Sequence, residues 1–519
     1  MSGYHYNLGR YFQEVAESHG HRPALRYPER DYSYQELLRT AERLGTWLTA
    51  QGCRRGDVIA IAHTKRPLSY ALMMAALRLG VAYVNLDVES PAARTLRILD
   101  VSRPHLMCYD DERYSDAMTA LAAAERCPLL FLAQDRVPEV GAADLAQQQA
   151  LMAGVDGSSV AYIMFTSGST GVPKGVAVTH QNVLHFIAWG QLCFAIETQD
   201  NFANLSPMYF DNSVFDFYVA LFSGACLSPI ARELLTRPYE LVNQVDRLGC
   251  TLWFCVPSLL IYLMAMKAMQ SVALSGLRTI VFGGEGYPKI ELKKLYDLFS
   301  HQARLVNVYG PTECTCICSA YTLGAHDFND LAGLPPLGRL NPNFDYRILN
   351  AEDQDSDLGE LCLIGPNVAA GYFNDEVRTA STFLTLTDSK RFMKRMYRTG
   401  DLVREDRGDL WFVGRKDNQI KHMGYRIELE EIENALVTIP QVRQAAVIYR
   451  RDHAAYGKLV GFVDCWETAD SAAILSALRD LVPDYMIPSR LVAMAELPKN
   501  ANGKVDRLVL KALLDDQPS

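Results

Sequence analysis

The first part of the chain alternates two spacings of hydrophobic residues. Segments 34–51 and 67–79 carry hydrophobic residues at helical spacing, whereas 58–62 and 82–86 are short apolar runs of strand length. The same alternation returns between residue 156 and about 325, for example in the apolar run 252–256. Helices that alternate with buried strands are typical of an α/β fold with a mostly parallel sheet. We therefore predict stacked α/β sheets over this part of the chain.

The hydrophobic pattern changes twice in the second part of the chain. Short apolar runs separated by Gly, Asn and Asp predict a β-rich subdomain, and the following residues mix two helical patterns with strand patterns. The second change predicts a small α+β domain. The predicted organisation is an N-terminal core over 1–416, with its β-rich subdomain at about 335–412, and a mobile C-terminal domain over 417–519. The predicted C-terminal elements are a helix at 428–438, strands at 444–450 and 458–465, and a helix at 470–481.

Length and charge narrow the classes of protein. A chain of 519 residues exceeds a single compact core, so several lobes are expected. The net charge of −9 argues against nucleic acid or an anionic membrane as the main partner. The basic stretch 390–395 is interpreted as a solvated loop, with docking of an acidic carrier protein as the alternative. No signal peptide or membrane-spanning run is present in the sequence, so we expect a cytoplasmic protein without membrane insertion.

Three of the twelve cysteines, Cys314, Cys316 and Cys318, lie close together. Their alternate spacing predicts a strand, on which they would crowd one face too closely to clamp a metal ion tetrahedrally. No histidine or second cysteine pair stands nearby at zinc-finger spacing. We interpret them as buried core cysteines.

A glycine- and hydroxyl-rich loop at 165–175 follows the apolar strand pattern 160–164. Glycines let the backbone turn its N–H groups toward an anion. A flexible linker is the alternative, although a linker does not need to follow a buried strand. The spacing of a Walker P-loop is absent. The side-chain donors of the loop are Thr166, Ser167, Ser169, Thr170 and Lys174, and its tight turns are at Gly168 and Gly171.

With this loop, the chain resembles the adenylate-forming superfamily, which includes acyl-CoA synthetases, luciferases and the adenylation domains of nonribosomal peptide synthetases. Six further motifs follow in the order expected for that superfamily. They are Asn-Val-Tyr-Gly-Pro-Thr-Glu at 307–313, Gly-Glu-Leu-Cys-Leu-Ile-Gly at 359–365 with Gly-Tyr-Phe at 371–373, Tyr-Arg-Thr-Gly-Asp at 397–401, Gly-Arg-Lys-Asp-Asn-Gln-Ile-Lys at 414–421, Gly-Tyr-Arg-Ile-Glu-Leu-Glu-Glu-Ile-Glu at 424–433, and 498–507 with its Asn-Gly-Lys.

The resemblance implies ATP and Mg²⁺ and a site for acyl adenylation. The carboxylate of an acid attacks the α-phosphorus of ATP and pyrophosphate leaves. Both reactants are anions, so positioning and charge neutralisation provide most of the catalysis. The implied catalytic residues are Lys504, which bridges the α-phosphate and the carboxylate, Thr312 at the α-phosphate, and Glu313 as the Mg²⁺ ligand.

The same resemblance implies the other nucleotide contacts. The loop 166–174 would hold the β- and γ-phosphates, Tyr309 would stack on adenine, and Asp401 would bind both ribose hydroxyls. Arg415 would contact ribose or phosphate. Further residues implied at the nucleotide are Gly284, Glu285, Asn307 and Gly310. A second half-reaction is also implied, in which the C-terminal domain rotates about a hinge at Asp417 and a phosphopantetheine thiol captures the acyl group.

The segment 210–218 resembles the part of peptide-synthetase adenylation domains that carries an amino-acid-binding Asp. Asp211 would pair with the α-ammonium of the substrate, because a buried carboxylate is costly unless it is paired. The alternative is an Asp that caps the following helix.

The pocket implied by that alignment contains no charged residue beyond Asp211 and the bridging Lys504. Phe215 and Phe254 would fill much of its volume, which favours a small neutral amino acid such as glycine or alanine. Gly283 would create space and admit proline or valine, and Asn212 would contact a polar group. The implied lining residues are Asn212, Phe215, Phe254, Val281, Gly283, Val308, Cys316 and Ile317.

Three functions fit these residues. The favoured one is a freestanding ligase that loads an amino acid onto a separate carrier protein, since 508–519 is too short for a carrier domain and 417–433 also resembles D-alanine–carrier protein ligases. The second is an acyl-CoA synthetase for a non-amino acid, against which Asp211 speaks. The third is a non-catalytic nucleotide binder, which the presence of Glu313, Asp401 and Lys504 disfavours.

Overall fold

The structure is a computed structural model, and it divides the chain into two compact units. The first unit comprises Met1–Val88, Leu99–Met164 and Gly175–Lys416, and the second comprises Glu89–Ile98, Phe165–Lys174 and Asp417–Ser519. The glycine-rich loop therefore groups with the C-terminal residues, which a division into two continuous ranges does not foresee. The structure describes residues 4–133, 137, 139–387, 393–451, 457–466, 470–500 and 505–515.

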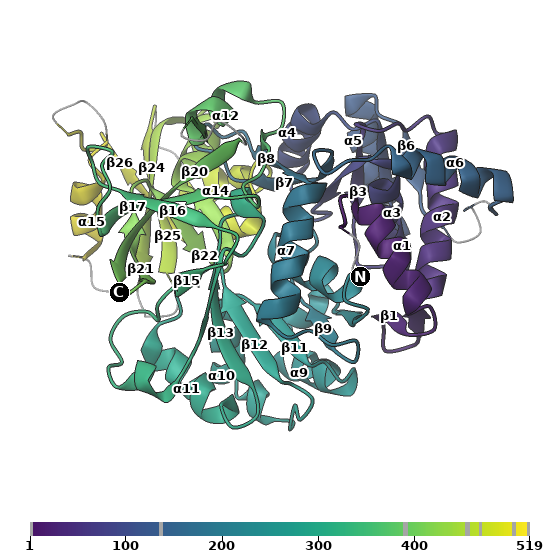
Figure 1. Cartoon of the computed structure of the whole chain (residues 1–519). Coiled ribbons are helices and arrows are strands. Elements are labelled where there is room, and N and C mark those ends of the chain that lie inside the picture. Colours follow the sequence, from purple (N-terminus) through teal and green to yellow (C-terminus); the bar gives the residue numbers. More distant parts are fainter. Residues whose placement is uncertain are drawn as a thin grey trace. The chain divides into compact units, whose positions relative to one another are not determined.

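Two large sheets make up most of the first unit (Figure 1). The strands of the first sheet are parallel over β7-β4-β3-β5-β6. Its order is β18 (Gly371–Tyr372), β8 (Lys174–Thr179), β7 (Val160–Thr166), β4 (Ala82–Leu86), β3 (Val58–Ala62), β5 (Leu106–Tyr109) and β6 (Leu129–Phe131).

The second sheet is parallel at its centre and has antiparallel strands at both edges. Figure 1 shows the helices α9, α10 and α11 beside its strands β11, β12 and β13. Its order is β15 (Arg339–Leu340), β14 (Ser319–Thr322), β13 (Arg304–Tyr309), β12 (Thr279–Gly283), β11 (Leu252–Cys255), β9 (Asn201–Asn204), β10 (Cys226–Pro229), β1 (Pro23–Arg26) and β2 (Asp31–Ser33).

A smaller antiparallel sheet forms the β-rich part of the first unit. Its order is β16 (Asp345–Leu349), β17 (Leu358–Ile364), β20 (Lys394–Asp406) and β19 (Phe383–Leu386), and β21 (Asp409–Arg415) also pairs with β20. The helices of the unit are α1 (Leu8–Ser18), α2 (Tyr34–Ala50), α3 (Pro67–Leu79), α5 (Ser115–Glu125), α6 (Ala142–Ala153), α7 (His180–Cys193), α8 (Asn212–Val214), α9 (Pro238–Arg247), α10 (Pro257–Ala265), α11 (Lys289–Phe299) and α12 (Glu376–Thr382), with α4 (Ala92–Ser102) shared between the units.

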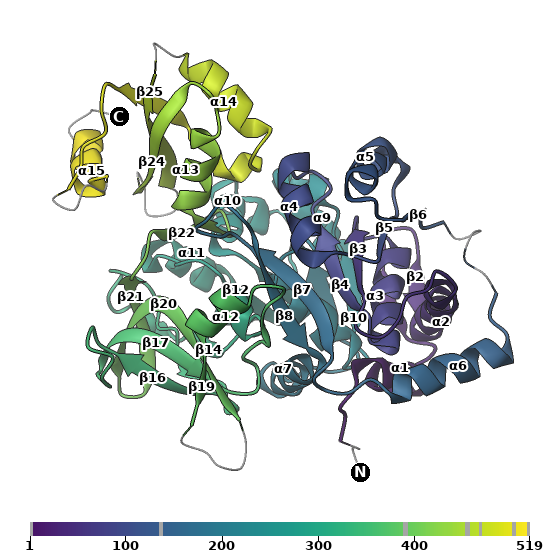
Figure 2. The same ribbon diagram turned by 90° about the horizontal axis from the view of Figure 1, so that it is seen from above.

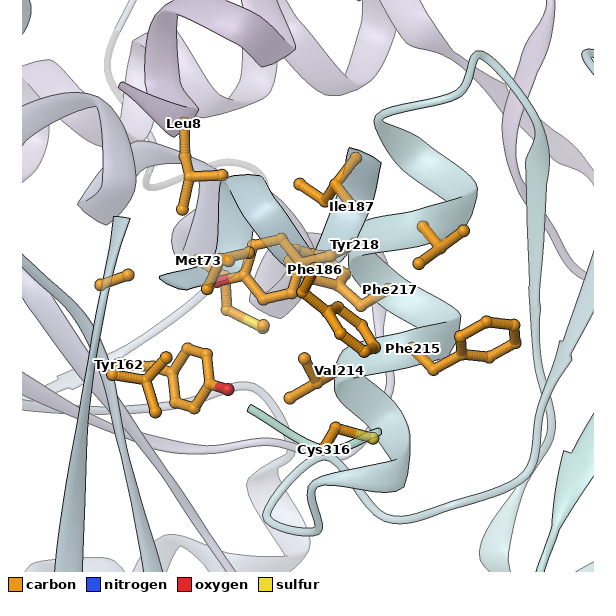
Figure 3. Close-up of a cluster of buried hydrophobic side chains, with 14 of the residues drawn as sticks. Leu8, Met73, Tyr162, Phe186, Ile187, Val214, Phe215, Phe217, Tyr218 and Cys316 are labelled. Carbon is orange, nitrogen blue, oxygen red and sulfur yellow. The ribbon is translucent and has the colours of Figure 1, made fainter. Parts of the chain in front are cut away.

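Local sequence explains where the N-terminal helices begin and end. Ser33 and Glu36 form a reciprocal capping box at the start of α2. α3 begins with Pro67, whose missing N–H costs nothing in the first turn, and ends at Gly80 in the left-handed conformation. The hydrophobic core of the unit continues from these helices to the segment 210–218 (the substrate segment), where Val214, Phe215, Phe217 and Tyr218 project from one helical stretch (Figure 3).

The C-terminal part of the second unit is a small α+β domain with its own core (Figure 2). α13 packs on β24, and the sheet order is β24-β25-β26. The elements are β22 (Gln419–His422), β23 (Tyr425–Glu428), α13 (Leu429–Val437), β24 (Val442–Arg451), β25 (Gly457–Cys465), α14 (Ser471–Arg479), β26 (Arg490–Met494) and α15 (Arg507–Asp515).

The predicted fold class is confirmed: large α/β sheets, a β-rich part and a small α+β domain are all present. Within the described ranges, no helix is both long and apolar enough to span a bilayer.

Candidate active site

Three polar side chains of β13, β20 and β21 are joined by hydrogen bonds in the first unit, and two of them, Tyr309 and Asp401, are buried. The Tyr309 hydroxyl donates to Asp401 Oδ2 at 2.7 Å, and Arg415 Nη1 donates to Asp401 Oδ1 at 2.5 Å. Asp401 and Arg415 face each other in the β20–β21 register. Burial raises the pKa of Tyr309 well above its ordinary value, so the hydroxyl remains a donor. The trio presents a carboxylate fixed from two sides beside an aromatic ring.

The turn that follows β13 carries Thr312, which is hydrogen-bonded to Asp211. Thr312 is predicted to contact the α-phosphate and Asp211 the α-ammonium of the amino acid. Thr312 begins a short 3-10 helix, and its Oγ1 donates to Asp211 Oδ2 at 2.6 Å. Asp211 occupies the N-cap position of α8, but its side chain makes no capping hydrogen bond. The capping alternative for Asp211 is therefore wrong, and its carboxylate is joined to the turn that carries Thr312.

Glu313 lies in the same turn and is fully buried. Its Oε1 accepts a hydrogen bond from the Tyr372 hydroxyl at 3.0 Å. A carboxylate suits Mg²⁺, which commonly takes one or two protein carboxylates and completes its shell with phosphate oxygens and water. No group of three His, Cys, Asp or Glu able to cage a metal occurs in the described part of the chain.

Four of the predicted pocket residues come from neighbouring positions of one sheet. Phe254 of β11 pairs with Val281 of β12, and Gly283 of β12 pairs with Val308 of β13. Phe215 is fully buried, and its ring packs edge-on against Phe254 at 5.5 Å between centroids. The structure thus brings these five residues together, although the Phe215 ring also belongs to the hydrophobic core, where it contacts a further phenylalanine of the chain.

Gly283 does not open space for a larger substrate. A Cβ at this position would strike the Val308 carbonyl oxygen and come within 2.6 Å of Val308 Cγ2. The glycine is needed for the close approach of β12 and β13. The inference from Gly283 to a proline or valine substrate is therefore wrong.

The cysteine cluster is buried as predicted, but it does not lie on a strand. Cys314 ends the 3-10 helix, and Thr315 and Cys316 have φ of 59° and 73°. Such left-handed conformations are uncommon outside glycine and asparagine and tend to occur at functional sites. The Cys316 carbonyl lies where a Cβ on Gly310 would be. The alternate spacing therefore belongs to a tight turn that fixes Cys316 and Ile317 after Glu313.

Several predicted nucleotide residues have structural partners. Glu285 Oε2 accepts from the backbone N–H of Ser258 at 3.1 Å, in the first turn of α10. Asn307 Nδ2 donates to the Pro336 carbonyl at 2.8 Å. Gly284 has φ of 86°, which favours glycine. These contacts shape the ends of β12 and β13, and a nucleotide contact by these residues stays a prediction.

The glycine-rich loop lies in the second unit. A Cβ on Gly168 would strike the Val172 carbonyl oxygen, so the tight turn requires glycine. Ser167 Oγ donates to the Arg426 carbonyl at 2.7 Å, and Lys174 Nζ donates to Glu428 Oε1 at 3.2 Å. The Gly168 N–H donates to Glu431 Oε2 at 3.3 Å. Hydrogen bonds therefore join the loop to residues 426–431, which excludes the flexible-linker alternative.

Sequence reasoning missed a buried polar network beneath the substrate segment. Phe215–Val219 form a π-helix, a form that is rare and frequent at functional sites. Asp216 Oδ2 accepts from Asn204 Nδ2 at 3.1 Å, whereas its Oδ1 has no hydrogen-bond partner among the described residues. Burial raises the pKa of Asp216 to about 8 and lowers that of nearby Lys65 to about 7.

Two predictions fall on residues outside the described ranges. Lys504 is one of them, and residues 390–392 of the basic stretch are the other. At the described end of that stretch, Arg395 Nη1 donates to the Ala369 carbonyl at 2.8 Å.

Comparison with known proteins places the chain among nucleotide-dependent enzymes. Residues 12–373 match the family model of AMP-binding enzymes, and residues 431–504 match that of the AMP-binding enzyme C-terminal domain. A D-alanine–D-alanyl carrier protein ligase of Bacillus licheniformis is 31% identical and aligns with 93% of this chain and 94% of its own length. An L-proline–[L-prolyl-carrier protein] ligase of Pseudomonas fluorescens is 32% identical over 92% of this chain and 93% of its own length.

A dimodular nonribosomal peptide synthase of Bacillus subtilis is 33% identical over 96% of this chain, which spans only 20% of the synthase. Among solved structures, the adenylation domain AlmE of Vibrio cholerae in complex with glycyl-adenosine-5′-phosphate is 25% identical. It superposes with a TM-score of 0.82 over 100% of this chain and 99% of that chain.

Proposed function

Because the chain belongs to the AMP-binding enzyme family, we propose that it activates an amino acid as aminoacyl-AMP and then transfers it to the phosphopantetheine thiol of a separate carrier protein. The family match agrees with the predicted resemblance to adenylate-forming enzymes. The observation that carries the amino-acid assignment is the Asp211 carboxylate, which is hydrogen-bonded to Thr312 in the turn predicted to contact the α-phosphate. This hydrogen bond supports the proposal because it joins the acceptor proposed for the ammonium group to the residue proposed for the α-phosphate.

The adenylation step uses ATP as a substrate. An oxygen of the amino-acid carboxylate forms a bond to the α-phosphorus while the bond to pyrophosphate breaks. Asp211 orients the amino acid through its α-ammonium, and Asp401, fixed by Tyr309 and Arg415, orients the ribose. Glu313 would hold Mg²⁺, which when bound neutralises phosphate charge. Lys504 supplies a cation at the two reacting anions.

We propose glycine or alanine as the substrate. Among the predicted lining residues of the pocket, only Asp211 is charged, and it binds the α-ammonium. The lining therefore has no charge left to pair with a charged side chain of the substrate. Phe215 and Phe254 pack against each other at its base, and Gly283 adds no room. The relatives include a D-alanine ligase, and the AlmE domain was solved with glycyl-adenosine-5′-phosphate. Both facts support a small substrate.

An acyl-CoA synthetase for a non-amino acid is the second candidate function. Such an enzyme has no cationic group for the half-buried carboxylate of Asp211 to bind, so this residue speaks against it. The carrier protein is favoured as acceptor because the two ligases that match nearly their whole length act on carrier proteins by name. A cytoplasmic location remains a prediction.

Amino-acid-dependent ATP–pyrophosphate exchange tests the proposal. The panel comprises the twenty amino acids, D-alanine, several β-amino acids, and aryl and fatty acids. Strong exchange with glycine or alanine is expected. Exchange with a larger amino acid alone would retain the amino-acid assignment and refute the small pocket. Exchange with a non-amino acid alone, followed by CoA-dependent release of AMP, would refute the carrier-protein ligase.

A further inference from the structure

Two glutamate side chains of the second unit accept hydrogen bonds from the glycine-rich loop. Glu428 Oε1 accepts from Lys174 Nζ at 3.2 Å, and Glu431 Oε2 accepts from the Gly168 N–H at 3.3 Å. Glu428 is 5% exposed and Glu431 is fully buried. Each glutamate therefore occupies a donor that the family resemblance assigns to a phosphate of ATP.

Further hydrogen bonds join the loop to β23 and α13. The Ser167 hydroxyl donates to the Arg426 carbonyl at 2.7 Å and accepts from the Glu428 N–H at 3.1 Å. Asn434 Nδ2 donates to the Ser169 carbonyl at 3.2 Å. The contact is thus a built interface with reciprocal hydrogen bonds, and it involves both backbone and side chains of the loop.

Two arginines of α4 add positive charge to the same cluster. Arg94 Nε lies 3.4 Å from Glu431 Oε1, and Arg97 Nη1 donates to the Gly171 carbonyl at 2.9 Å. With Lys174, the cluster holds three cations around the glycine-rich loop. Leaving one charge of such a cluster buried and unpaired would be strongly unfavourable. The cluster therefore needs an anion at all times, and the glutamates provide it.

We propose that Glu428 and Glu431 replace the phosphates of ATP on this loop once pyrophosphate has left, and so hold β23 and α13 in place for the thioester-forming half-reaction. The loop then binds either phosphate or the two glutamates, because both use the Gly168 N–H and the Lys174 ammonium. This inference rests on the proposed function. It makes Glu428 and Glu431 positioning residues of the second half-reaction.

Charge and covalent connection determine when the loop binds ATP and when it binds the two glutamates. A triphosphate carries more negative charge and more acceptor oxygens than two carboxylates, so ATP displaces the glutamates when it is abundant. The glutamates belong to the same chain as the loop, so their effective concentration stays high after pyrophosphate diffuses away. Departure of pyrophosphate is thereby coupled to docking of β23 and α13 on the loop.

The first test measures binding of inorganic tripolyphosphate to the full-length protein by titration calorimetry. Glu428→Gln and Glu431→Gln keep the side-chain shape and remove the competing charge. Each is expected to tighten tripolyphosphate binding about tenfold, because phosphate then no longer has to displace a charge-assisted hydrogen bond from the loop. Affinities equal to that of the unsubstituted protein would overturn the inference.

Glu430→Gln is the matched control for both glutamates. Glu430 lies on the same helix, but its carboxylate contacts Asn418 and Arg507 rather than the loop. Its affinity for tripolyphosphate should equal that of the unsubstituted protein. Should Glu431→Gln fail to fold because Arg94 loses its partner, Glu428→Asp, which retains the charge but withdraws it from Lys174, gives an independent measurement and should also tighten binding.

The second test separates the two half-reactions. Glu428→Gln and Glu431→Gln should lower the KM for ATP in pyrophosphate exchange and slow carrier-protein loading at least tenfold, whereas Glu430→Gln should change neither. Loading that is unchanged, or an equal loss in both half-reactions, would overturn the inference. If no amino acid supports exchange in the unsubstituted protein, the proposed function fails, and the tripolyphosphate measurement still decides whether the glutamates compete with phosphate.

Discussion

Asp211 and Thr312 share one hydrogen bond although each is predicted to contact a different substrate. The Thr312 hydroxyl has a single proton, and that proton is directed at Asp211. Contact with an α-phosphate oxygen requires the same proton. An ammonium group that binds Asp211 would neutralise the carboxylate and so weaken its hydrogen bond to the hydroxyl, which could then turn to the phosphate more easily. Amino-acid binding and α-phosphate contact are therefore expected to support each other at the level of single residues.

Replacing Asp211 by Asn tests its role in substrate binding. The amide keeps the shape of the carboxylate but removes the charge that pairs with the α-ammonium. A charged hydrogen bond contributes ~1.5–3 kcal/mol, so kcat/KM for the amino acid should fall about 10- to 150-fold. The KM for ATP should change little, because Asp401 and the loop remain. Initial rates of pyrophosphate exchange at varied amino-acid concentration provide the measurement.

Asp297→Asn serves as the control for this change. Asp297 lies on α11 in an exposed ion pair with Lys293, and its substitution should leave both KM values unaltered. If Asp211→Asn behaves like Asp297→Asn, the substrate has no cationic group at this position, and a non-amino acid becomes the favoured substrate.

The π-helix at Phe215–Val219 forms the second half of the substrate segment and sets the direction of its side chains. It follows α8 directly, so one continuous helical stretch carries Asn212, Phe215 and Asp216. Lys65 Nζ, in the polar network of Asp216, donates to the carbonyls of Asn204, Leu205 and Ile230. These bonds tie the ends of β9 and β10 together beneath the π-helix.

The raised pKa of Asp216 predicts a pH-dependent contribution to stability. Because its pKa is about 8 in the folded protein and ~3.9 when unfolded, the folded protein binds more protons between these values, and stability falls as pH rises. Asp216→Asn has no such titration. Between pH 5 and 7 the wild-type protein should lose about 2–3 kcal/mol of unfolding free energy relative to Asp216→Asn. Urea unfolding at both pH values measures the difference.

Lys65 does not mask that effect, because its own pKa, lowered to about 7, changes stability mainly above pH 7. A difference between the two proteins that stays constant from pH 5 to 7 would show that Asp216 is ionised in the folded state. Asp297→Asn, at an exposed site, should show no pH-dependent difference over the same range.

Elements with a regular hydrophobic period were predictable, whereas irregular turns were not. α3 and β3 coincide with the predicted segments 67–79 and 58–62, because Pro67 and Gly80 mark the ends of the helix and a short, fully buried apolar run has strand length. The π-helix has neither period. The cysteines at 314, 316 and 318 suggested a strand, because their alternate spacing in the sequence does not reveal the left-handed backbone at Thr315 and Cys316. Such conformations are imposed by tertiary contacts that no local pattern records.

In the candidate site, too, the local motifs were predictable from the sequence, whereas their tertiary partners were not. The glycine-rich loop was recognisable from its composition, but its partners were not. Glu428 and Glu431 stand more than two hundred residues further along the chain, at the start of a helix, where acidic residues ordinarily complement the helix dipole. Gly283 was misinterpreted because the sequence does not show whether a missing side chain leaves a cavity or admits a neighbouring strand.

At the scale of the whole molecule, the chain passes between the two units at several points, and the last of them lies between Lys416 and Asp417. The family resemblance predicts that Asp417 is a hinge and that Lys504 acts in adenylation alone. Asp417 Oδ1 accepts from the Gln419 N–H at 3.2 Å, so the residue already shapes the first turn of the second unit. If the units change arrangement between half-reactions, the backbone at Asp417 must change its dihedral angles.

Asp417→Pro and Lys504→Ala should therefore damage different half-reactions. Proline fixes φ near −65° and removes the N–H, which holds the junction in one arrangement. Asp417→Pro should retain one half-reaction and slow the other at least about a hundredfold, whereas Asp417→Asn, which keeps the side-chain acceptor, should retain both.

Lys504→Ala should reduce pyrophosphate exchange about 10²- to 10³-fold, as loss of a charge at the reacting atoms does elsewhere. Carrier loading from supplied aminoacyl-AMP should survive in Lys504→Ala. Equal losses in both half-reactions for Asp417→Pro would mean that position 417 supports the fold, and that the hinge lies elsewhere.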